Sequence, residues 1–253
     1  MTKFVDTHCH IHEPAYALAI EDVFSRAQEA GVDAMIVVGT SLASTQQAIE
    51  FAAKHAGVVA AIGVHPHDTK DGYDLTSFAG TFEKIVAVGE IGLDYYYGHS
   101  PREVQQAALR AQLKIAQQHN YPVIFHVREA IDDFWPIFDE FAGIRGVLHS
   151  YTDTQENLDE ALKRGLYIGV NGISTFTKDP AQQAMFDAIP LDRLLLETDA
   201  PFLTPTPFRG TVNEPAYVPL IAAHHATRRS ISVEALAEQT TANAHALFGQ
   251  LTS

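Results

Sequence analysis

Short runs of apolar and β-branched residues alternate along this chain with longer segments whose apolar residues recur every three to four positions. The first pattern predicts buried strands, and the second predicts helices with one face on a sheet. Eight strands are expected, at 4–8, 34–39, 58–64, 85–90, 123–127, 146–149, 166–170 and 194–198. Helices are expected near 18–30, 42–55, 101–120, 130–142, 155–164, 180–188, 215–228 and 233–247.

Eight β/α alternations in a chain of 253 residues predict a (β/α)₈ barrel of the TIM type, as a single domain over residues 1–253. No linker, residue-level repeat or low-complexity tract divides the chain. An open, doubly wound parallel sheet is the alternative architecture. The strongest helix start is Ser100-Pro101-Arg102-Glu103, where Ser100 is expected to cap the helix.

Composition and charge narrow the possible partners. Lys and Arg number 17 against 31 Asp and Glu, a net charge of −14, so any nucleic acid must be held locally rather than by a broad cationic surface. Hydrophobic residues at 46% and charged residues at 19% exclude disordered and fibrous classes. The single Cys9, the absence of an apolar leader and the lack of a membrane-length apolar run predict a cytoplasmic protein without membrane contact.

Histidines stand at the carboxyl ends of several predicted strands, the edge where barrels carry their chemistry. His8 and His10 flank Cys9, so their side chains point the same way and can bind one metal ion. Cys9 is expected to be a small buried residue facing the opposite way. His126 and His149 end the fifth and sixth strands. Taken singly, the first pair can be a surface feature and the other two can be core histidines.

Carboxylates occupy two further strand ends. Glu90 follows a mostly apolar run, and burying a carboxylate is costly unless it binds a cation. The last strand carries Glu197 and is followed by Asp199, which puts two acids on one face where the chain leaves the barrel. Glu90 can also be a salt-bridged loop residue, and Asp199 can cap a turn. Because so many strand ends carry His, Glu or Asp together, we interpret them jointly as a metal site.

Imidazole and carboxylate ligands suit Zn²⁺, Mn²⁺, Mg²⁺ or a similar divalent ion, and this number of ligands can hold two ions bridged by one carboxylate. Two ions about 3.5–4 Å apart can clamp the oxygens of a displacement at phosphorus and lower the pKa of a bound water. The implied chemistry is hydrolysis. His65 follows the third strand and is a candidate substrate contact. Solvated or capping roles are expected for the helical histidines His55, His119, His224, His225 and His245.

Several multi-residue motifs, in order along nearly the whole chain, resemble the TatD-type metal-dependent deoxyribonucleases of the amidohydrolase superfamily. The motifs are Asp6-Thr7-His8-Cys9-His10, Gly63-Val64-His65-Pro66, Gly89-Glu90-Ile91-Gly92-Leu93-Asp94-Tyr95, His126-Val127-Arg128-Glu129-Ala130, Leu196-Glu197-Thr198-Asp199-Ala200-Pro201, and Arg209-Gly210 followed by Asn213-Glu214-Pro215.

The resemblance implies that His8, His10 and Asp199 hold one ion. It implies that His126 and His149 hold a second ion and that Glu90 bridges the two. Asp199 would also handle the proton of the attacking water, so Glu90 and Asp199 are the expected catalytic residues. Substrate contacts are expected from His65, Arg128, Glu197 and Arg209. The implied activity is hydrolysis of phosphodiester bonds at single-stranded or 3′ DNA ends, of the 3′-5′ exonuclease type, by a hydroxide on the ions.

The chain departs from the family pattern at two places. Asp153 stands where the family usually has glycine, and its charge is expected near the incoming phosphate. Thr211 and Val212 stand where basic residues are common. One alternative is a hydrolase of the same superfamily acting on a non-nucleic-acid ester, an amide or a small phosphoester, and another is a catalytically silent metal-binding protein. No obligate protein partner is expected.

Overall fold

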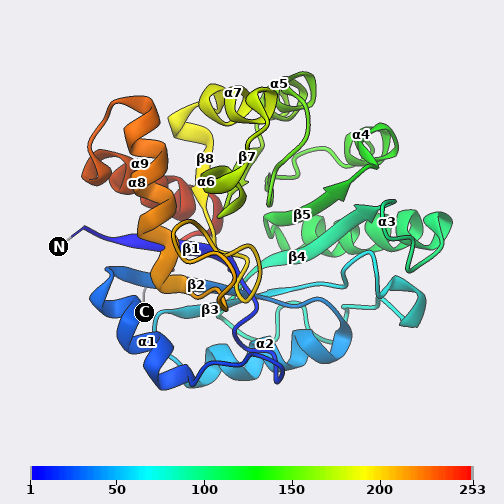
Figure 1. The fold of residues 1–253 in the computed structure, drawn as a ribbon. Coiled ribbons are helices and arrows are strands. Elements are labelled where there is room, and N and C mark those ends of the chain that lie inside the picture. The colour runs from blue at the N-terminus through cyan, green and yellow to red at the C-terminus, as the bar shows by residue number, and fades with distance from the viewer. Residues whose placement is uncertain (1, 252–253) are drawn as a thin grey trace.

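The computed structural model describes residues 2–251. Eight parallel strands form one sheet in which the order across the sheet is the order along the chain (Figure 1). The strands are β1 (Phe4–Cys9), β2 (Val32–Val38), β3 (Val58–Ile62), β4 (Ile85–Asp94), β5 (Val123–Arg128), β6 (Gly146–Leu148), β7 (Tyr167–Val170) and β8 (Leu194–Leu196).

The sheet closes where the end of β1 meets the chain beyond β8. Cys9 forms a parallel bridge with Ala200, and the backbone N–H of Asp199 donates to the carbonyl of His8 at 2.9 Å. In a doubly wound sheet the strand order reverses at a switch point and the two edges stay apart. The sequential order and the closure therefore confirm the predicted (β/α)₈ barrel and exclude the open sheet.

The predicted helices are present with small shifts at their ends, and they surround the barrel (Figure 1). The observed helices are α1 (Ile20–Glu29), α2 (Leu42–Lys54), α3 (Arg102–His119), α4 (Ile131–Asp139), α5 (Gln155–Lys163), α6 (Ile173–Phe176), α7 (Pro180–Ala188), α8 (Val218–Arg229) and α9 (Val233–Phe248). Short 3₁₀ turns at Thr69–Asp71 and Leu191–Arg193, together with α6, were not predicted. The first residues of the helix expected at 215–228 form a 3₁₀ turn, Pro215–Tyr217, directly before α8. Among residues 2–251, no helix is long and apolar enough to cross a membrane.

The predicted cap at Ser100 is wrong. Helix α3 begins one residue later than expected, with Pro101 in the cap position and no side-chain cap. The Ser100 hydroxyl instead donates to the carbonyl of His67 at 2.7 Å and accepts the backbone N–H of Lys70 at 3.2 Å. Ser100 therefore ties two loops of the barrel together, and this tertiary use of its hydroxyl replaces the local cap.

Helix α9 covers the amino ends of the strands. Its Thr241 donates to the carbonyl of Lys3 at 3.1 Å, and Asn243 donates to Leu194 at 2.8 Å, so it crosses the starts of β1 and β8. Leu247 and Phe248 join a cluster of small and branched side chains from the barrel strands, including Val5, Ala34, Ile36, Val59, Ala61, Ala87, Ile124, Val147 and Leu195. Apolar side chains therefore close the barrel at the amino ends of the strands, and the polar groups described next lie at the carboxyl ends.

Candidate metal centre

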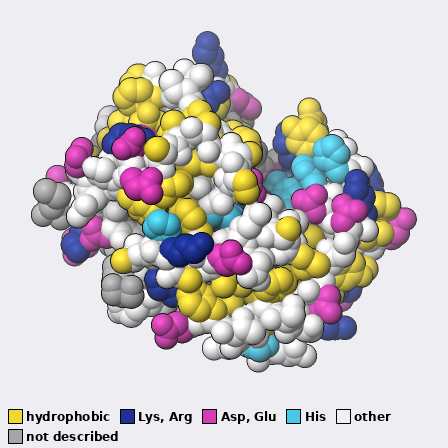
Figure 2. Space-filling view, turned by 90° about the horizontal axis from the view of Figure 1, so that it is seen from below, with side chains coloured by type: hydrophobic (Ala, Val, Ile, Leu, Met, Phe, Trp, Pro, Cys, Tyr) yellow, Lys and Arg dark blue, Asp and Glu magenta, His cyan; other side chains and the backbone are white. Residues whose placement is uncertain are grey.

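The residues predicted at the strand ends meet in one place. His8 and His10 come from the end of β1, Glu90 from β4 and His126 from β5. His149 directly follows β6, and Asp199 lies three residues after β8. They border a cavity of about 760 Å³, except for His8, which is fully buried beneath it. Figure 2 shows histidine side chains gathered at one side of a hollow in the surface, with acidic side chains beside them.

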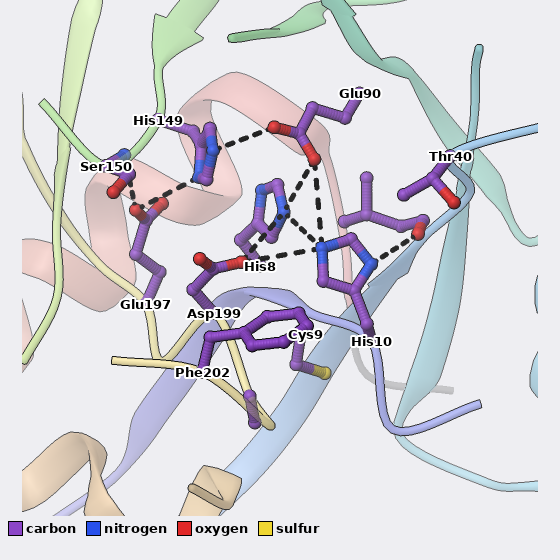
Figure 3. Close-up of polar contacts among 12 residues, drawn as sticks. His8, Cys9, His10, Thr40, Glu90, His149, Ser150, Glu197, Asp199 and Phe202 are labelled. Carbon is purple, nitrogen blue, oxygen red and sulfur yellow. Dashed lines mark hydrogen bonds and ion pairs between the residues drawn. The ribbon is translucent and has the colours of Figure 1, made fainter. Parts of the chain in front are cut away.

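One set of donor atoms surrounds a common point (Figure 3). The Nε2 atoms of His8 and His10 lie 3.0 Å apart. Glu90 Oε2 lies 3.5 and 3.7 Å from these two nitrogens, and Asp199 Oδ1 lies 3.6 and 3.4 Å from them. A tetrahedral site with ligands about 2.0–2.2 Å from its ion has edges of about 3.3–3.6 Å. The donor atoms of His8, His10 and Asp199, which all lie within 4.8 Å of one another, are therefore spaced to share one divalent ion, and Glu90 Oε2 approaches the same two histidines.

The other oxygen of Glu90 faces a second set of histidines. Its Oε1 lies 2.8 Å from His126 Nδ1 and 2.9 Å from His149 Nε2. His65 Nε2 is 3.6 Å from the same oxygen. Each oxygen of one carboxylate thus has its own group of nitrogens, which is the arrangement expected of a carboxylate that bridges two ions.

Two of these histidines are oriented by hydrogen bonds of their outer nitrogens, and the outer nitrogen of a third lies beside a carboxylate. His10 Nδ1 donates to the carbonyl of Val38 at 2.9 Å, and His126 Nε2 donates to Asp94 Oδ2 at 3.0 Å. His149 Nδ1 lies 3.3 Å from Glu197 Oε1. Metal-binding histidines in proteins are held in this way, because a proton fixed on one ring nitrogen leaves the other free to bind the ion. The donor set therefore fits divalent ions.

The charges of the site also favour a cation. Burial by itself raises the pKa of Glu90, but His149, His65 and His126 hold this pKa well below its usual range. Burial opposes ionisation of Asp199 too, yet His10 and the neighbouring histidines lower its pKa. Both carboxylates are therefore ionised in a largely closed site, where bound cations offset their charge.

The comparisons with known proteins agree with this geometry. The family described as TatD related DNase matches residues 5–249.

The chain belongs to this family.

An uncharacterized metal-dependent hydrolase of Bacillus subtilis (strain 168), YabD, is 36% identical over 249 residues, which cover 96% of this chain and 98% of that protein. The protein named 3'-5' ssDNA/RNA exonuclease TatD in Enterobacter lignolyticus (strain SCF1) is also 36% identical, covering 96% and 98% of the two chains. The crystal structure of YJJV, a TatD homolog from Escherichia coli K12, superposes with a TM-score of 0.90 at 29% identity, covering 98% of both. The present chain is thus a metal-dependent hydrolase of the TatD family.

Glu197 differs from its predicted place as a substrate contact. Its side chain is 1% exposed and does not border the cavity, whereas His149 does. Figure 3 shows Glu197 beside His149 and Ser150. Glu197 Oε1 accepts the backbone N–H of Ser150 at 2.6 Å and contacts His149. Asp199, in contrast, is 15% exposed and borders the cavity. The two acids do not share one face: in this TatD-family site Glu197 supports a histidine and Asp199 faces the open space.

Of the predicted cationic contacts, Arg128 borders the cavity and Arg209 does not. Arg209 donates to the carbonyl of Thr204 at 2.7 Å, and its guanidinium lies 3.8 Å from the ring centre of Phe176. Its side chain is therefore held between its own loop and the end of α6. His65 borders the cavity as predicted.

Asp153 also lies outside the cavity. Its carboxylate accepts the backbone N–H of Thr154 at 2.7 Å and the side-chain amide of Asn157 at 2.8 Å, at the start of α5. It borders a neighbouring groove rather than the cavity of the histidines. The expectation that Asp153 faces the incoming phosphate is therefore not met.

Sequence reasoning missed the role of Asp94. This carboxylate is fully buried and accepts hydrogen bonds from His126 at 3.0 Å and His67 at 2.9 Å. The fourth strand was expected to end at Glu90, whereas β4 continues to Asp94. The alternation Glu90, Gly92, Asp94 along an extended strand is the signal that places both acids on one side.

Three further side chains test the predictions for Cys9 and for the histidines of the helices. Cys9 is fully buried, its Sγ pointing to the carbonyl of Ile36 at 3.6 Å, as predicted (Figure 3). His225 was expected to be solvated or capping, but it is fully buried, with Nε2 3.0 Å from the hydroxyl of Ser174. The packing of α8 against α6 covers it. His245 does cap, because its Nδ1 lies 3.1 Å from the carbonyl of Gly249 at the end of α9.

Proposed function

We propose that this TatD-family hydrolase is a deoxyribonuclease that cleaves phosphodiester bonds at single-stranded or 3′ DNA ends, in the 3′-5′ direction, with two divalent ions. The observation that carries the proposal is Glu90, whose two oxygens face two separate groups of histidines. Paired ions bridged in this way are suited to displacement at phosphorus. The 36% identical relative named as a 3'-5' ssDNA/RNA exonuclease supports the choice of substrate.

The first ion would be held by His8, His10 and Asp199. The second would be held by His126 and His149, with Glu90 shared between the two. Zn²⁺, Mn²⁺ and Mg²⁺ all accept ligands from this set. Ions in these places supply positive charge for the phosphate oxygens and lower the pKa of a water in the site.

Asp199 is placed to receive the proton of the attacking water. One of its oxygens faces His8 and His10, and its side chain borders the cavity. Its lowered pKa keeps it ionised near neutral pH. Glu90, at 5% side-chain exposure, is enclosed by histidines and is therefore a bridging ligand rather than a proton acceptor.

Arg128 is the only Lys or Arg side chain that borders the cavity within residues 2–251. A phosphate at the centre would therefore find one fixed cationic side chain, with His65 beside it. So few cationic contacts favour binding of the last nucleotides of a strand over binding along a long duplex.

The cytoplasmic location predicted from the sequence stays a prediction.

The test combines metal removal with a substrate panel. After treatment with a strong chelator and confirmation by metal analysis, the protein should lose cleavage of a single-stranded oligonucleotide and regain it with Mn²⁺, Mg²⁺ or Zn²⁺. The panel adds lactones, amides and small phosphoesters. Undiminished cleavage without metal would refute the ion-dependent mechanism, and activity only on a non-nucleic-acid substrate would replace the proposed one.

A further inference from the structure

Large apolar side chains are exposed at only two places in residues 2–251, and both are at the open end of the barrel. Tyr96 and Tyr97, 54% and 53% exposed, directly follow β4. Phe202 and Phe208, 58% and 42% exposed, lie in the segment after β8. Because the strands run in order around a closed barrel, β4 and β8 stand on opposite sides of the mouth. Exposed aromatic rings gathered at a catalytic cavity indicate a binding surface.

On the side of the mouth next to β4, Tyr96 and Tyr97 are held in place by several contacts. The backbone N–H groups of Tyr96 and Tyr97 both donate to Asp94 Oδ1 at 3.0 Å. The guanidinium of Arg128 lies 4.1 Å from the ring centre of Tyr96 and 4.9 Å from that of Tyr97. His99 stacks almost parallel to Tyr97, with ring centres 5.6 Å apart. Figure 2 shows apolar side chains directly beside the histidines at the hollow.

On the opposite side of the mouth, after β8, the exposed ring is Phe202. Its backbone N–H donates to the carbonyl of Asp199 at 2.8 Å, and its carbonyl accepts from the side-chain amide of Asn213, so the backbone is held. The ring lies next to Asp199 (Figure 3) and stacks on no other aromatic ring in residues 2–251. Phe208 differs, because it stacks on Tyr217 with ring centres 4.9 Å apart and planes 6° from parallel.

Of the four exposed rings, Tyr97 and Phe202 border the cavity of the metal centre. The neighbouring groove beyond Arg128 is lined by Glu129, Asp132, Asp133, Asp153, Glu156 and Asp179. These carboxylates repel a phosphate backbone. A nucleic-acid strand is therefore directed away from this groove and into the cavity that Tyr97 and Phe202 border.

We propose that Phe202 and Tyr97 bind unpaired nucleobases by stacking, on the two sides of the mouth, so that the site takes single-stranded nucleic acid. This inference rests on the proposed nuclease function. Every base offers a flat π face, so stacking holds a strand without reading its sequence. Bases inside a duplex are covered by their neighbours, so a paired end must fray before either ring can reach it. Arg128, fixed above the tyrosines, is placed to contact the backbone beside the stacked base.

The test measures KM and kcat separately on a single-stranded oligonucleotide. Phe202→Ala should raise KM about tenfold, within the range for one base–aromatic stack, with kcat changed less than about twofold. Phe202→Tyr keeps an aromatic ring and should therefore have a KM close to that of wild type. Tyr97→Ala should also raise KM, whereas Tyr97→Phe should leave it close to the wild-type value. Phe208→Ala is the matched control, because it removes an exposed ring of the same segment that does not border the cavity, and KM should stay unchanged.

Substrates that lack one base distinguish the loss of base stacking from a general disturbance of the protein structure by the substitution. An oligonucleotide that is abasic at one of its last two nucleotides should bind wild type about tenfold more weakly, and Phe202→Ala should add nothing further on that substrate. Oligonucleotides with 2-aminopurine at these positions should lose fluorescence on binding wild type and keep it with Phe202→Ala.

The outcomes distinguish this inference from the proposed function. Cleavage by wild type, with KM and 2-aminopurine emission unaffected by Phe202→Ala and Tyr97→Ala, overturns the stacking site alone. An equal rise in KM on intact and abasic substrates overturns it as well. Absence of cleavage by metal-loaded wild type, with ring-dependent quenching still present, overturns the nuclease proposal and leaves the stacking site standing.

Discussion

Replacement of Glu197 tests whether this carboxylate acts through His149 or on the substrate. Glu197 Oε1 lies 2.6 Å from the backbone nitrogen of Ser150 and 3.3 Å from His149 Nδ1, and the side chain is 1% exposed. If it fixes the orientation of His149, its loss should weaken metal binding. If it contacts substrate, as the sequence suggested, its loss should change KM at saturating metal instead.

The expected magnitudes follow from the hydrogen bond to Ser150 and the ion-pair contact with His149 that are lost. Glu197→Gln keeps an oxygen at the acceptor position and loses only the charge, which is worth about 1 kcal/mol, or about fivefold in metal affinity. Glu197→Ala leaves the Ser150 N–H without its acceptor and removes the carboxylate that lies 3.3 Å from His149 Nδ1. Loss of a group that orients a metal-binding histidine weakens metal affinity by about 10- to 100-fold, and we expect the upper end because Glu197 is 1% exposed.

The assay is a competition titration of the metal-free protein against a chromophoric chelator, with kcat and KM measured at saturating metal. Glu140→Gln, which removes an exposed carboxylate paired with Arg110, controls for the loss of one charge. Circular dichroism and thermal unfolding show whether each variant is folded. Unchanged metal affinity in a folded Glu197→Ala protein would refute the orienting role.

Three further outcomes are expected. Glu90→Gln should reduce activity about tenfold more than His126→Ala, because Glu90 faces both groups of histidines; equal small losses would show that it does not bridge. Binding of single-stranded DNA should depend weakly on salt, with a log–log slope near −1 to −2, and a slope of about −4 or steeper would imply six phosphate contacts. Burial lowers the pKa of His225 to about 3, so the folded state binds fewer protons than the unfolded state between pH 3 and 6.5 and loses stability as pH falls through that window. When the pH is lowered from 7 to 4.5, the free energy of unfolding measured by urea titration should fall by about 2–3 kcal/mol less in His225→Gln than in wild type. An equal fall in the two proteins would contradict this.

The sequence by itself determined the barrel and the residues around the metal centre. Strand and helix periodicity are local properties, and the eight alternations needed no knowledge of contacts. In a parallel barrel all strands end at the same face, so side chains at the ends of separate runs must meet there. This is why His8, His10, Glu90, His149 and Asp199 could be placed together from their positions along the chain alone.

Only the tertiary structure decided which polar groups face the cavity. Glu197 and Asp199 are two residues apart, but β8 ends at Leu196 and Asp199 has a φ of 58°, so strand alternation no longer governs them. Glu197 therefore turns behind His149 while Asp199 faces the open space. His225 is likewise buried because α8 packs against neighbouring elements, with Ser174 of α6 and Phe186 of α7 beside the ring. Such roles depend on contacts between segments far apart in the chain, and local patterns carry no information about those contacts.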